Sequence, residues 1–463
     1  MKSASSDSLL EAWNGTLARV ADGPAIYDTR GEILRSFRDI EEEAQGYERE
    51  LLGEFRSGDV IAIQIGNHAA SPALLLACLR KCVVALPLER TIAARERDVA
   101  LEICHAAAIV DAEKTVALRK LAHEKIDWGA NQPVLLKLTS GTTAAPRAIR
   151  FRSEQLLADC TQICETMGIT SRDLNFTVIP LSHSYGFSNL LTPLLTRGVP
   201  MVLSRDRMPR ALLNDLAHTN ATVFPGMPVF YQAFSEMDDV PALPQLRLCI
   251  SAGAPLPLEV ARKFRERFKR SIHSFYGSSE CGGICYDREA PLLDEGFVGQ
   301  PMLGAELDLL EPEAAATRVR VRSAAAGDGY FPEPDEEKLG RGIFVPDDLL
   351  RAGENGFRIV GRISDLINVA GKKVNPAEVE AELLRFGGVR AAVVFARESV
   401  LRNEEVAACI VAGDGVRESD LLEFCRGRLS GWQVPKRIFF VDEIPVNERG
   451  KVSRRELALK FRS

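Results

Sequence analysis

The chain has 463 residues, which is long enough for a large hydrophobic core and for more than one domain. Hydrophobic residues make up 46% and charged residues 26%, and the net charge of -6 gives no reason to expect binding to nucleic acid or to an anionic membrane. The first residues lack the apolar core of a signal peptide, no apolar run reaches membrane-spanning length, and ten scattered cysteines suit a reducing compartment. We therefore expect a cytoplasmic protein with no membrane insertion.

The first two thirds of the chain alternate between strand-like and helical patterns. The β-branched run at 60–65 is typical of a buried parallel strand. A helix is expected at 71–81 and a second apolar strand at 83–86, which together make a βαβ unit. Further expected elements are a helix at 153–167 and strands at 176–179, 201–203, 222–224 and 246–250.

The pattern of expected secondary structure changes toward the C-terminus. Beyond Gly299 the pattern favours short strands with hairpin signals. From Gly361 onward, about 100 residues carry enough apolar elements to fold as a separate unit. This unit is expected to contain a helix-start segment at 374–384, strands at 391–395 and 407–411, and a helix at 418–429. Two domains are therefore predicted, 1–361 and 362–463.

A hydroxyl-rich segment, residues 138–147, stands between an apolar strand and a basic stretch. A strand that leads into such a loop offers backbone N–H groups, hydroxyl groups and a guanidinium to one anion, and a polyphosphate is its natural ligand. The spacing is not that of a Walker A loop, because no Gly-Lys-Ser/Thr follows. A solvated Ser/Thr-rich turn is an equally good interpretation of this segment alone.

Five later segments carry groups that would complete a nucleotide site. Tyr276 offers a stacking face, and Asp348 offers an acceptor for ribose hydroxyls. Glu280 offers a carboxylate for a hard cation such as Mg²⁺. Lys451 or Arg362 can offset the negative charge that builds up when an α-phosphorus is attacked. The segments are 251–256, 276–280, 347–348, 361–365 and 450–452.

Taken in this order, the segments resemble the acyl-adenylate-forming superfamily of acyl-CoA synthetases, peptide-synthetase adenylation domains and firefly-type luciferases. The resemblance runs from about Gly58 to the C-terminus. It implies an α/β fold with a large N-terminal domain of layered α/β subdomains, a distorted β-barrel-like part and a small mobile α+β C-terminal domain. It rests on residues 74–88, 139–147, 180–186, 299–301 and 432–436.

The resemblance implies an acid–thiol ligase that uses ATP and Mg²⁺. In such enzymes a carboxylate attacks the α-phosphorus of ATP to give acyl-AMP and pyrophosphate, and a thiol then takes the acyl group. The thiol belongs to CoA or to the phosphopantetheine of an acyl-carrier protein. A swing of the C-terminal domain separates the two steps, with the hinge at Ser364.

Residue roles follow from the same resemblance. Lys451 would contact the carboxylate and the α-phosphate, Glu280 would ligate Mg²⁺, and His183 would gate the pocket. Asp348 and Arg362 would bind ribose, and Gly371 would line the pantetheine tunnel. The phosphate loop would consist of Thr139, Ser140, Gly141, Thr142, Thr143 and Arg147. The other nucleotide-binding residues would be Gly253, Ala254, Pro255, Tyr276, Gly277 and Ser279.

An acyl pocket of mostly small and apolar residues is implied by family position. It would accept an uncharged acyl tail, either an aromatic acid or a medium-to-long fatty acid. No charged group in it would pair with the ammonium of an amino acid. Its expected residues are Tyr185, Phe187, Gly226, Met227, Ser251, Ala252, Ser278, Gly282 and Gly283.

Three positions depart from the family pattern. Ser364 stands where Asp or Lys is usual, and Pro146-Arg147 with two preceding alanines replaces the usual glycine-rich Pro-Lys-Gly ending of the loop. Asn368 replaces the lysine of luciferase-type enzymes, which makes a luciferase-like fate of the acyl-AMP a weaker alternative. A catalytically silent nucleotide-binding homologue is the other alternative.

Overall fold

A computed structural model describes residues 7–112, 115–139, 147–204, 206, 208–291, 295–369, 372–399, 403–445 and 452–461, without the side chains of residues 364, 399 and 403. The chain divides into two compact units. No helix in these ranges is long and apolar enough to cross a membrane. Unit 1 comprises Met1–Asp308, Arg320–Val345 and Gly353–Arg358, and unit 2 comprises Leu309–Val319, Pro346–Ala352 and Ile359–Ser463.

Unit 1 contains a seven-stranded sheet with a parallel centre. Its strands are β3 (Val60–Gln64), β4 (Val84–Pro87), β5 (Ala106–Ala112), β6 (Val116–Lys120), β7 (Leu135–Leu138), β8 (Ala148–Phe151) and β18 (Gly329–Phe331), in the order β18-β8-β7-β4-β3-β5-β6. β3 pairs in parallel with β4 and β5, which confirms the expected βαβ unit. The pairs β7–β8 and β8–β18 are antiparallel, so a hairpin carries the hydroxyl-rich loop.

A second, larger sheet of unit 1 is also parallel at its centre. It has eleven strands, and the first nine in sheet order are β2 (Ile33–Ser36), β1 (Pro24–Tyr27), β10 (Met201–Leu203), β9 (Asn175–Thr177), β11 (Val223–Gly226), β12 (Leu248–Ser251), β13 (Ile272–Ser278), β14 (Gly282–Tyr286) and β15 (Phe297–Pro301). The strands from β1 through β13 run parallel, while β14 and β15 pair antiparallel with their neighbours. Ligands of open α/β sheets bind at the carboxyl ends of such parallel strands.

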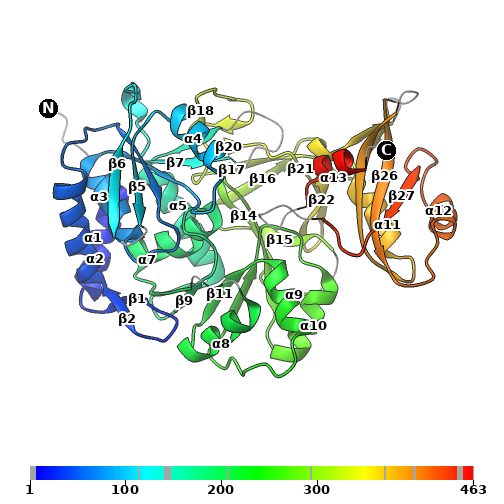
Figure 1. Cartoon of the computed structure of the whole chain (residues 1–463), viewed down its shortest axis with the longest axis horizontal. Helices are drawn as coiled ribbons and strands as arrows, with labels where there is room; N and C mark the ends of the chain where they lie inside the picture. Colours follow the sequence, from blue (N-terminus) through cyan, green and yellow to red (C-terminus); the bar gives the residue numbers. More distant parts are fainter. Residues whose placement is uncertain are drawn as a thin grey trace. The chain divides into compact units, whose positions relative to one another are not determined.

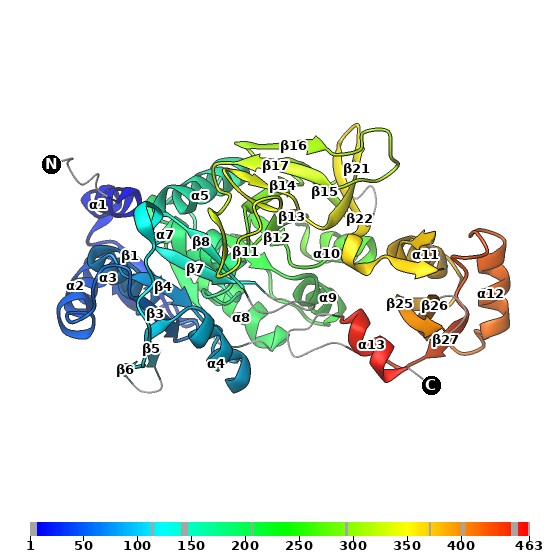
Figure 2. The same ribbon diagram turned by 90° about the horizontal axis from the view of Figure 1, so that it is seen from above.

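Helices cover these sheets. α1 (Ser8–Val20), α5 (Ser153–Met167) and α7 (Thr192–Arg197) pack against one another, and α2 (Phe37–Gly46) packs against α3 (Ser71–Lys81). α8 (Pro209–Thr219), α9 (Pro228–Glu236) and α10 (Leu258–Phe268) form a series beside β11, β12 and β13 in both views (Figures 1 and 2). The shorter elements are η1 (Tyr47–Leu51), α4 (Ala94–Ile103), η2 (Gly129–Asn131), α6 (Ser184–Gly186) and η3 (Phe187–Leu191).

Four of the short strands that follow residue 299 form a separate sheet of order β16-β17-β20-β19. The alternation of buried and exposed residues along β17 is typical of a sheet with one covered face. The strands are β16 (Ala305–Leu309), β17 (Val319–Ser323), β19 (Leu339–Gly340) and β20 (Ile343–Phe344).

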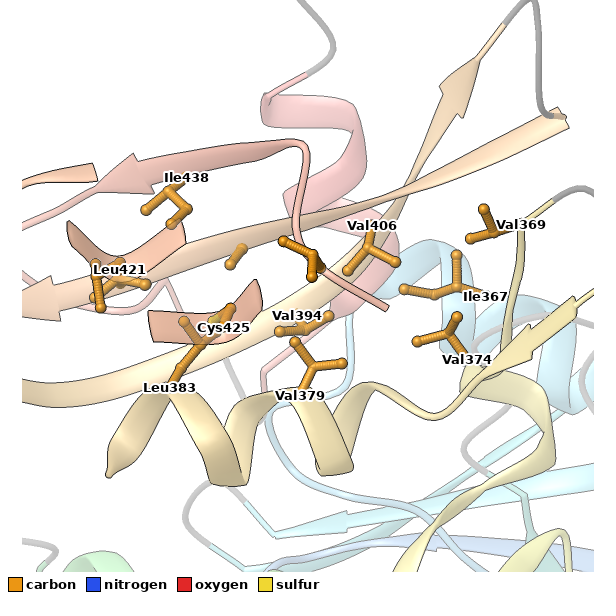
Figure 3. Close-up of a cluster of buried hydrophobic side chains, with 13 residues drawn as sticks. Ile367, Val369, Val374, Val379, Leu383, Val394, Val406, Leu421, Cys425 and Ile438 are labelled. Carbon is orange, nitrogen blue, oxygen red and sulfur yellow. The ribbon is translucent and has the colours of Figure 1, made fainter. Parts of the chain in front are cut away.

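Unit 2 has its own core. Val379 on α11 points toward Val394 on β25, and Leu383 on α11 points toward Cys425 (Figure 3). Val406 on β26, which pairs with β25, belongs to the same cluster. Leu421 on α12 joins the same cluster. The elements are β21 (Asp348–Gly353), β22 (Gly356–Arg362), which begins in unit 1, η4 (Ile363–Asp365), β23 (Ile367–Val369), β24 (Lys372–Val374), α11 (Pro376–Leu384), β25 (Val389–Ser399), β26 (Asn403–Ala412), α12 (Glu418–Arg426), β27 (Arg437–Phe440) and α13 (Arg454–Lys460).

The expected fold class is confirmed, since a large N-terminal α/β part precedes a small C-terminal part. The helices expected at 71–81 and 153–167 coincide with α3 and α5. The helix expected at 418–429 is shorter, because Gly427 caps α12 at Arg426. The domain boundary between residues 361 and 362 stays a prediction.

Candidate active site

The two ends of the hydroxyl-rich loop are held together. The Thr139 amide donates a hydrogen bond of 2.8 Å to the Arg147 carbonyl oxygen, and the Thr139 hydroxyl donates to the same oxygen at 3.1 Å. These bonds extend the ladder between β7 and β8 by one residue pair. Ser140, Gly141, Thr142 and Thr143 lie outside the described residues, and their roles stay predictions.

A tyrosine links the exit of this loop to the expected metal ligand. The Tyr330 hydroxyl donates a hydrogen bond of 3.1 Å to Glu280 Oε1. The Arg147 guanidinium lies over the Tyr330 ring, with its carbon 4.1 Å from the ring centroid. Tyr330 reaches this position because β18 pairs with β8. Burial raises the pKa of Glu280, and the hydrogen bond from Tyr330 acts in the opposite direction.

Glu280 could hold a magnesium ion whose remaining coordination positions are filled by a bound substrate and water. No group of three or more His, Cys, Asp or Glu side chains that could hold a metal ion occurs among the described residues. A ready-made cage is therefore absent from that part of the chain. Magnesium commonly uses one or two carboxylates together with substrate phosphates and water, and the single carboxylate of Glu280 fits that donor set.

The segment from Pro180 to Phe187 is a tightly folded turn. The Tyr185 amide donates to His183 Nδ1 at 3.2 Å, so the ring nitrogen Nε2 carries the proton when His183 is neutral. A Cβ on Gly186 would lie 2.1 Å from the Pro180 carbonyl oxygen, which explains the glycine. The exposed His183 and the buried Phe187 therefore have fixed positions, and Phe187 begins the π-helical turn η3.

A pair of hydroxyl groups connects this turn to the segment that precedes Glu280. The Ser184 hydroxyl donates to the Ser279 hydroxyl at 2.9 Å. Tyr276 does not follow a strand but lies inside one. Tyr276, Gly277 and Ser278 lie within β13, because pairing with β14 extends that strand to Ser278.

The ends of the parallel strands bring several expected pocket residues together. Gly226 at the end of β11 pairs with Ser251 at the end of β12. The Ser251 hydroxyl is buried and has no hydrogen-bond partner among the described residues. Gly253 has a φ of 87°, and a Cβ there would meet Met227 at an ordinary contact distance of 4.0 Å. Gly253, Ala254 and Pro255 are exposed, and Ala252 is buried.

The expected pocket glycines pack closely against protein groups. A Cβ on Gly226 would lie 2.8 Å from the Phe224 ring. A Cβ on Gly283 would lie 2.3 Å from the Met302 sulfur, and one on Gly282 would lie 2.0 Å from Asp159 Oδ1. These glycines therefore allow close packing on the side of the missing Cβ, and that side holds no free space for an acyl group.

Asp348 and Arg362 belong to unit 2 and form an ion pair. Arg362 Nε donates to Asp348 Oδ1 at 2.6 Å, with Asp348 mostly buried and Arg362 mostly exposed. Ser364 lies in the short 3₁₀ turn η4. Gly371 and Lys451 lie outside the described residues. The hinge, tunnel and lysine roles thus stay predictions.

Sequence patterns alone missed three residues of this region. Tyr330 comes from a strand that is distant in sequence from both of its partners. Asp159 lies among the buried polar residues of α5. Lys137 interrupts the apolar strand β7, and this interruption is the one signal that could have identified it.

The chain is similar to known proteins along most of its length. The family model for the AMP-binding enzyme matches residues 15–321, and the model for the AMP-binding enzyme C-terminal domain matches residues 378–451. A feruloyl-CoA synthase from an Amycolatopsis species is 27% identical over 440 residues, which cover 88% of this chain and 89% of that protein. A 3,4-dihydroxybenzoate–[aryl-carrier protein] ligase from Bacillus anthracis is 29% identical over 338 residues, or 73% of this chain and 76% of that protein.

Structural comparison gives the same result for the fold. The ATP-bound structure of MatB from Rhodopseudomonas palustris superposes with a TM-score of 0.85 at 22% sequence identity, covering 97% of this chain and 98% of that one. The resemblance to the acyl-adenylate-forming superfamily is confirmed by the two family models. Since the first of these models spans well over half of the sequence, the chain belongs to the AMP-binding enzyme family.

Proposed function

We propose that this enzyme activates a carboxylic acid with ATP and transfers the resulting acyl group to a pantetheine thiol. The observation that carries the proposal is the contact chain from Glu280 through Tyr330 to Arg147 at the closed base of the hydroxyl-rich loop. It places a carboxylate and a guanidinium beside the same loop. A nucleotide triphosphate with its magnesium ion needs both kinds of group.

In the first step a carboxylate oxygen of the acid bonds to the α-phosphorus, and the bond to the β-phosphate oxygen breaks, releasing pyrophosphate. Arg147 and the donors of the loop would hold the β- and γ-phosphates. Glu280 would hold Mg²⁺, which neutralises phosphate charge when it is bound. Tyr276 and Gly253 would flank adenine.

The remaining roles concern the ribose and the two conformations. Asp348 and Arg362 would bind the ribose hydroxyls. Lys451 would stabilise charge on the carboxylate and the α-phosphate during adenylation. In the second step a thiolate attacks the acyl carbon and AMP leaves. His183 would gate the pocket between the acyl and thiol channels, and a rotation at Ser364 would bring the segment up to Gly371 into place.

The acid and the thiol acceptor are proposed from the apolar residues expected in the acyl pocket and from the names of similar proteins. Two similar proteins are named for feruloyl-CoA synthesis and for a 3,4-dihydroxybenzoate–aryl-carrier protein ligase, and their names support an aromatic acid. Other similar proteins are long-chain-fatty-acid–CoA ligases, so a fatty acid is the alternative substrate. CoA is one acceptor and an acyl-carrier protein is the other.

The test is ATP–pyrophosphate exchange without a thiol, across aromatic, short-chain, medium-chain and long-chain acids. We expect one class to give strong exchange. A Tyr330→Phe variant should lose roughly 10- to 150-fold in exchange, because one hydrogen bond to the Glu280 carboxylate is worth roughly 1.5–3 kcal/mol. The proposal would be contradicted if no acid supported exchange and no thioester formed from added acyl-AMPs and CoA. That result would favour a catalytically silent nucleotide-binding homologue.

Lys451 provides a second, independent test. A Lys451→Ala variant should lose adenylation while retaining thioester formation from preformed acyl-AMP. Equal loss of both half-reactions would contradict its assignment to the first step. Product analysis with and without CoA would reveal a luciferase-like diversion of the acyl-AMP.

A further inference from the structure

Tyr330 contacts two groups that have roles in the proposed function, and it has no role of its own there. Its side chain comes from β18, and the residue is 2% exposed. The hydroxyl donates to Glu280 Oε1 at 3.1 Å, and the ring lies under the Arg147 guanidinium, whose carbon is 4.1 Å from the ring centroid. One side chain therefore meets the expected metal ligand with its polar end and an expected phosphate ligand with its ring face.

The strand that carries Tyr330 is fixed between these two groups. The Gly327 amide donates to the Glu280 carbonyl oxygen at 2.8 Å, and the Asp328 amide donates to a carbonyl oxygen of β8 at 2.9 Å. The Asp328 carboxylate accepts hydrogen bonds of 2.6 and 3.1 Å from the Arg152 guanidinium. β18 also pairs with β8, which follows the hydroxyl-rich loop. The backbone that carries Tyr330 is therefore held both to this hairpin and to the backbone of Glu280.

The hydroxyl group can orient Glu280 for a metal ion. A phenol hydroxyl is protonated at neutral pH and can donate its proton to a carboxylate oxygen. This bond fixes the orientation of the Glu280 carboxylate. Magnesium demands near-ideal octahedral geometry, so it benefits from a ligand of fixed orientation. Without the bond, the partly buried carboxylate would be less oriented and more costly to keep charged.

The ring can orient Arg147 for phosphate. A guanidinium that stacks on an aromatic face keeps the N–H donors at its edges available to other acceptors. Among the described residues, the Arg147 side chain forms no hydrogen bond or ion pair, so its donors are unused in that part of the chain. A guanidinium binds phosphate through two parallel hydrogen bonds, and this mode of binding depends on its orientation.

We propose that Tyr330 is a positioning residue whose two ends serve two different ligands. Its hydroxyl orients Glu280 for Mg²⁺, and its ring orients Arg147 for the β- and γ-phosphates of ATP. This inference rests on the proposed function and deepens it, because it separates metal binding from phosphate binding at one side chain. A tyrosine that only filled the core would affect both kinds of binding equally.

The experiment measures ATP binding by isothermal titration calorimetry, without any acid so that no adenylation occurs. Each protein is titrated with ATP once in excess Mg²⁺ and once in EDTA. Tyr330→Phe keeps the ring and removes the hydroxyl, so the dissociation constant of ATP should rise about 10-fold or more in Mg²⁺ and stay unchanged in EDTA. Tyr330→Leu also removes the ring, so the dissociation constant in EDTA should rise as well, by about 5-fold.

The control is a second fully buried tyrosine. The Tyr231 hydroxyl on α9 donates hydrogen bonds of 2.9 Å to the carbonyl oxygens of Phe224 and Ile250. Tyr231→Phe removes these bonds, so it should lower stability and leave ATP binding unchanged in both conditions. Tyr330→Phe removes a single oxygen atom, and its response must differ between Mg²⁺ and EDTA. This variant therefore keeps the inference testable if Tyr330→Leu fails to fold.

Three results would overturn the inference. The first is a Tyr330→Phe variant that binds ATP in Mg²⁺ as tightly as the wild type. The second is the same loss of affinity for this variant in Mg²⁺ and in EDTA, as a purely structural tyrosine would require. The third is a Tyr330→Leu variant that binds ATP in EDTA as tightly as Tyr330→Phe. A wild type that binds no ATP in either condition would contradict the proposed function itself, so the two failures are distinguishable.

Discussion

Replacing Arg454 should selectively destabilise unit 2. Arg454 is the first residue of α13, and its Nη1 donates to Glu380 on α11 and, at 2.7 Å, to the Val394 carbonyl on β25. Its Nε donates to Asp365 in η4 at 3.1 Å. One guanidinium therefore joins α11, α13, β25 and η4. An Arg454→Met variant keeps most of the side-chain length and removes every one of these bonds.

The magnitude follows from the exposure of the partners. The side chains of Arg454 and Glu380 are 27% and 16% exposed, so Glu380 would be left as a largely buried charge without its partner. Breaking a buried pair in this way costs about 3–5 kcal/mol. The Asp365 side chain is 34% exposed, so water screens the Arg454–Asp365 ion pair and reduces its contribution to stability. We therefore expect a loss of about 3 kcal/mol in the free energy of unfolding of unit 2.

Hydrogen exchange followed by mass spectrometry measures this loss segment by segment. A loss of about 3 kcal/mol corresponds to roughly 100-fold faster exchange of the protected amides of β25 and β26, with peptides of the seven-stranded sheet unchanged. The control variant is Arg426→Met, which removes an exposed arginine of α12. If Arg454→Met exchanged like the control, the idea that Arg454 holds unit 2 together would be wrong.

Three further predictions concern unit 1. Asp173 forms two hydrogen bonds of 2.7 Å with Arg247, and although burial acts to raise its pKa, this guanidinium holds that pKa below its ordinary value of 3.8. The pair should therefore stabilise the fold fully above about pH 4, and this stabilisation should disappear as the pH falls further. Asp173→Asn should remove this part of the pH dependence of the free energy of unfolding, measured by urea titration, and should cost about 2 kcal/mol at pH 7. Gly282→Ala combines a φ of 67° with a Cβ placed 2.0 Å from Asp159 Oδ1, so we expect a loss of more than 3 kcal/mol, seen as a large fall in the urea midpoint. Gly253→Ala makes only an ordinary contact with Met227 at a φ of 87° and should cost only about 1 kcal/mol; an equal effect of the two alanines would refute the steric explanation.

Local elements were predictable where several sequence signals agreed. The helix α5 coincides with the predicted range because an apolar pattern of helical period ends at Gly168, whose φ of 65° suits a left-handed cap. α3 likewise begins with a proline in its first turn. The β-branched strand β3 was recognisable because it is buried on both faces.

The contacts of the candidate site depend on pairings between distant segments and were not predictable in this way. Tyr330 reaches Glu280 only because β18 pairs with β8, and no local pattern specifies that pairing. Asp159 meets the Gly283 amide only because α5 packs against β14, and that placement depends on how the whole unit packs. Family resemblance supplied Glu280, which no local pattern distinguishes from a solvated loop acid.

The most direct test of the proposed function is the stoichiometry of products when the purified enzyme turns over ATP with its preferred acid and CoA or a loaded carrier protein. We expect AMP, pyrophosphate and thioester to form in a ratio of one to one to one, with acyl-AMP accumulating when the thiol is withheld. Formation of ADP and inorganic phosphate, or of AMP without any acyl product, would contradict the assignment of this chain as an AMP-forming acid–thiol ligase.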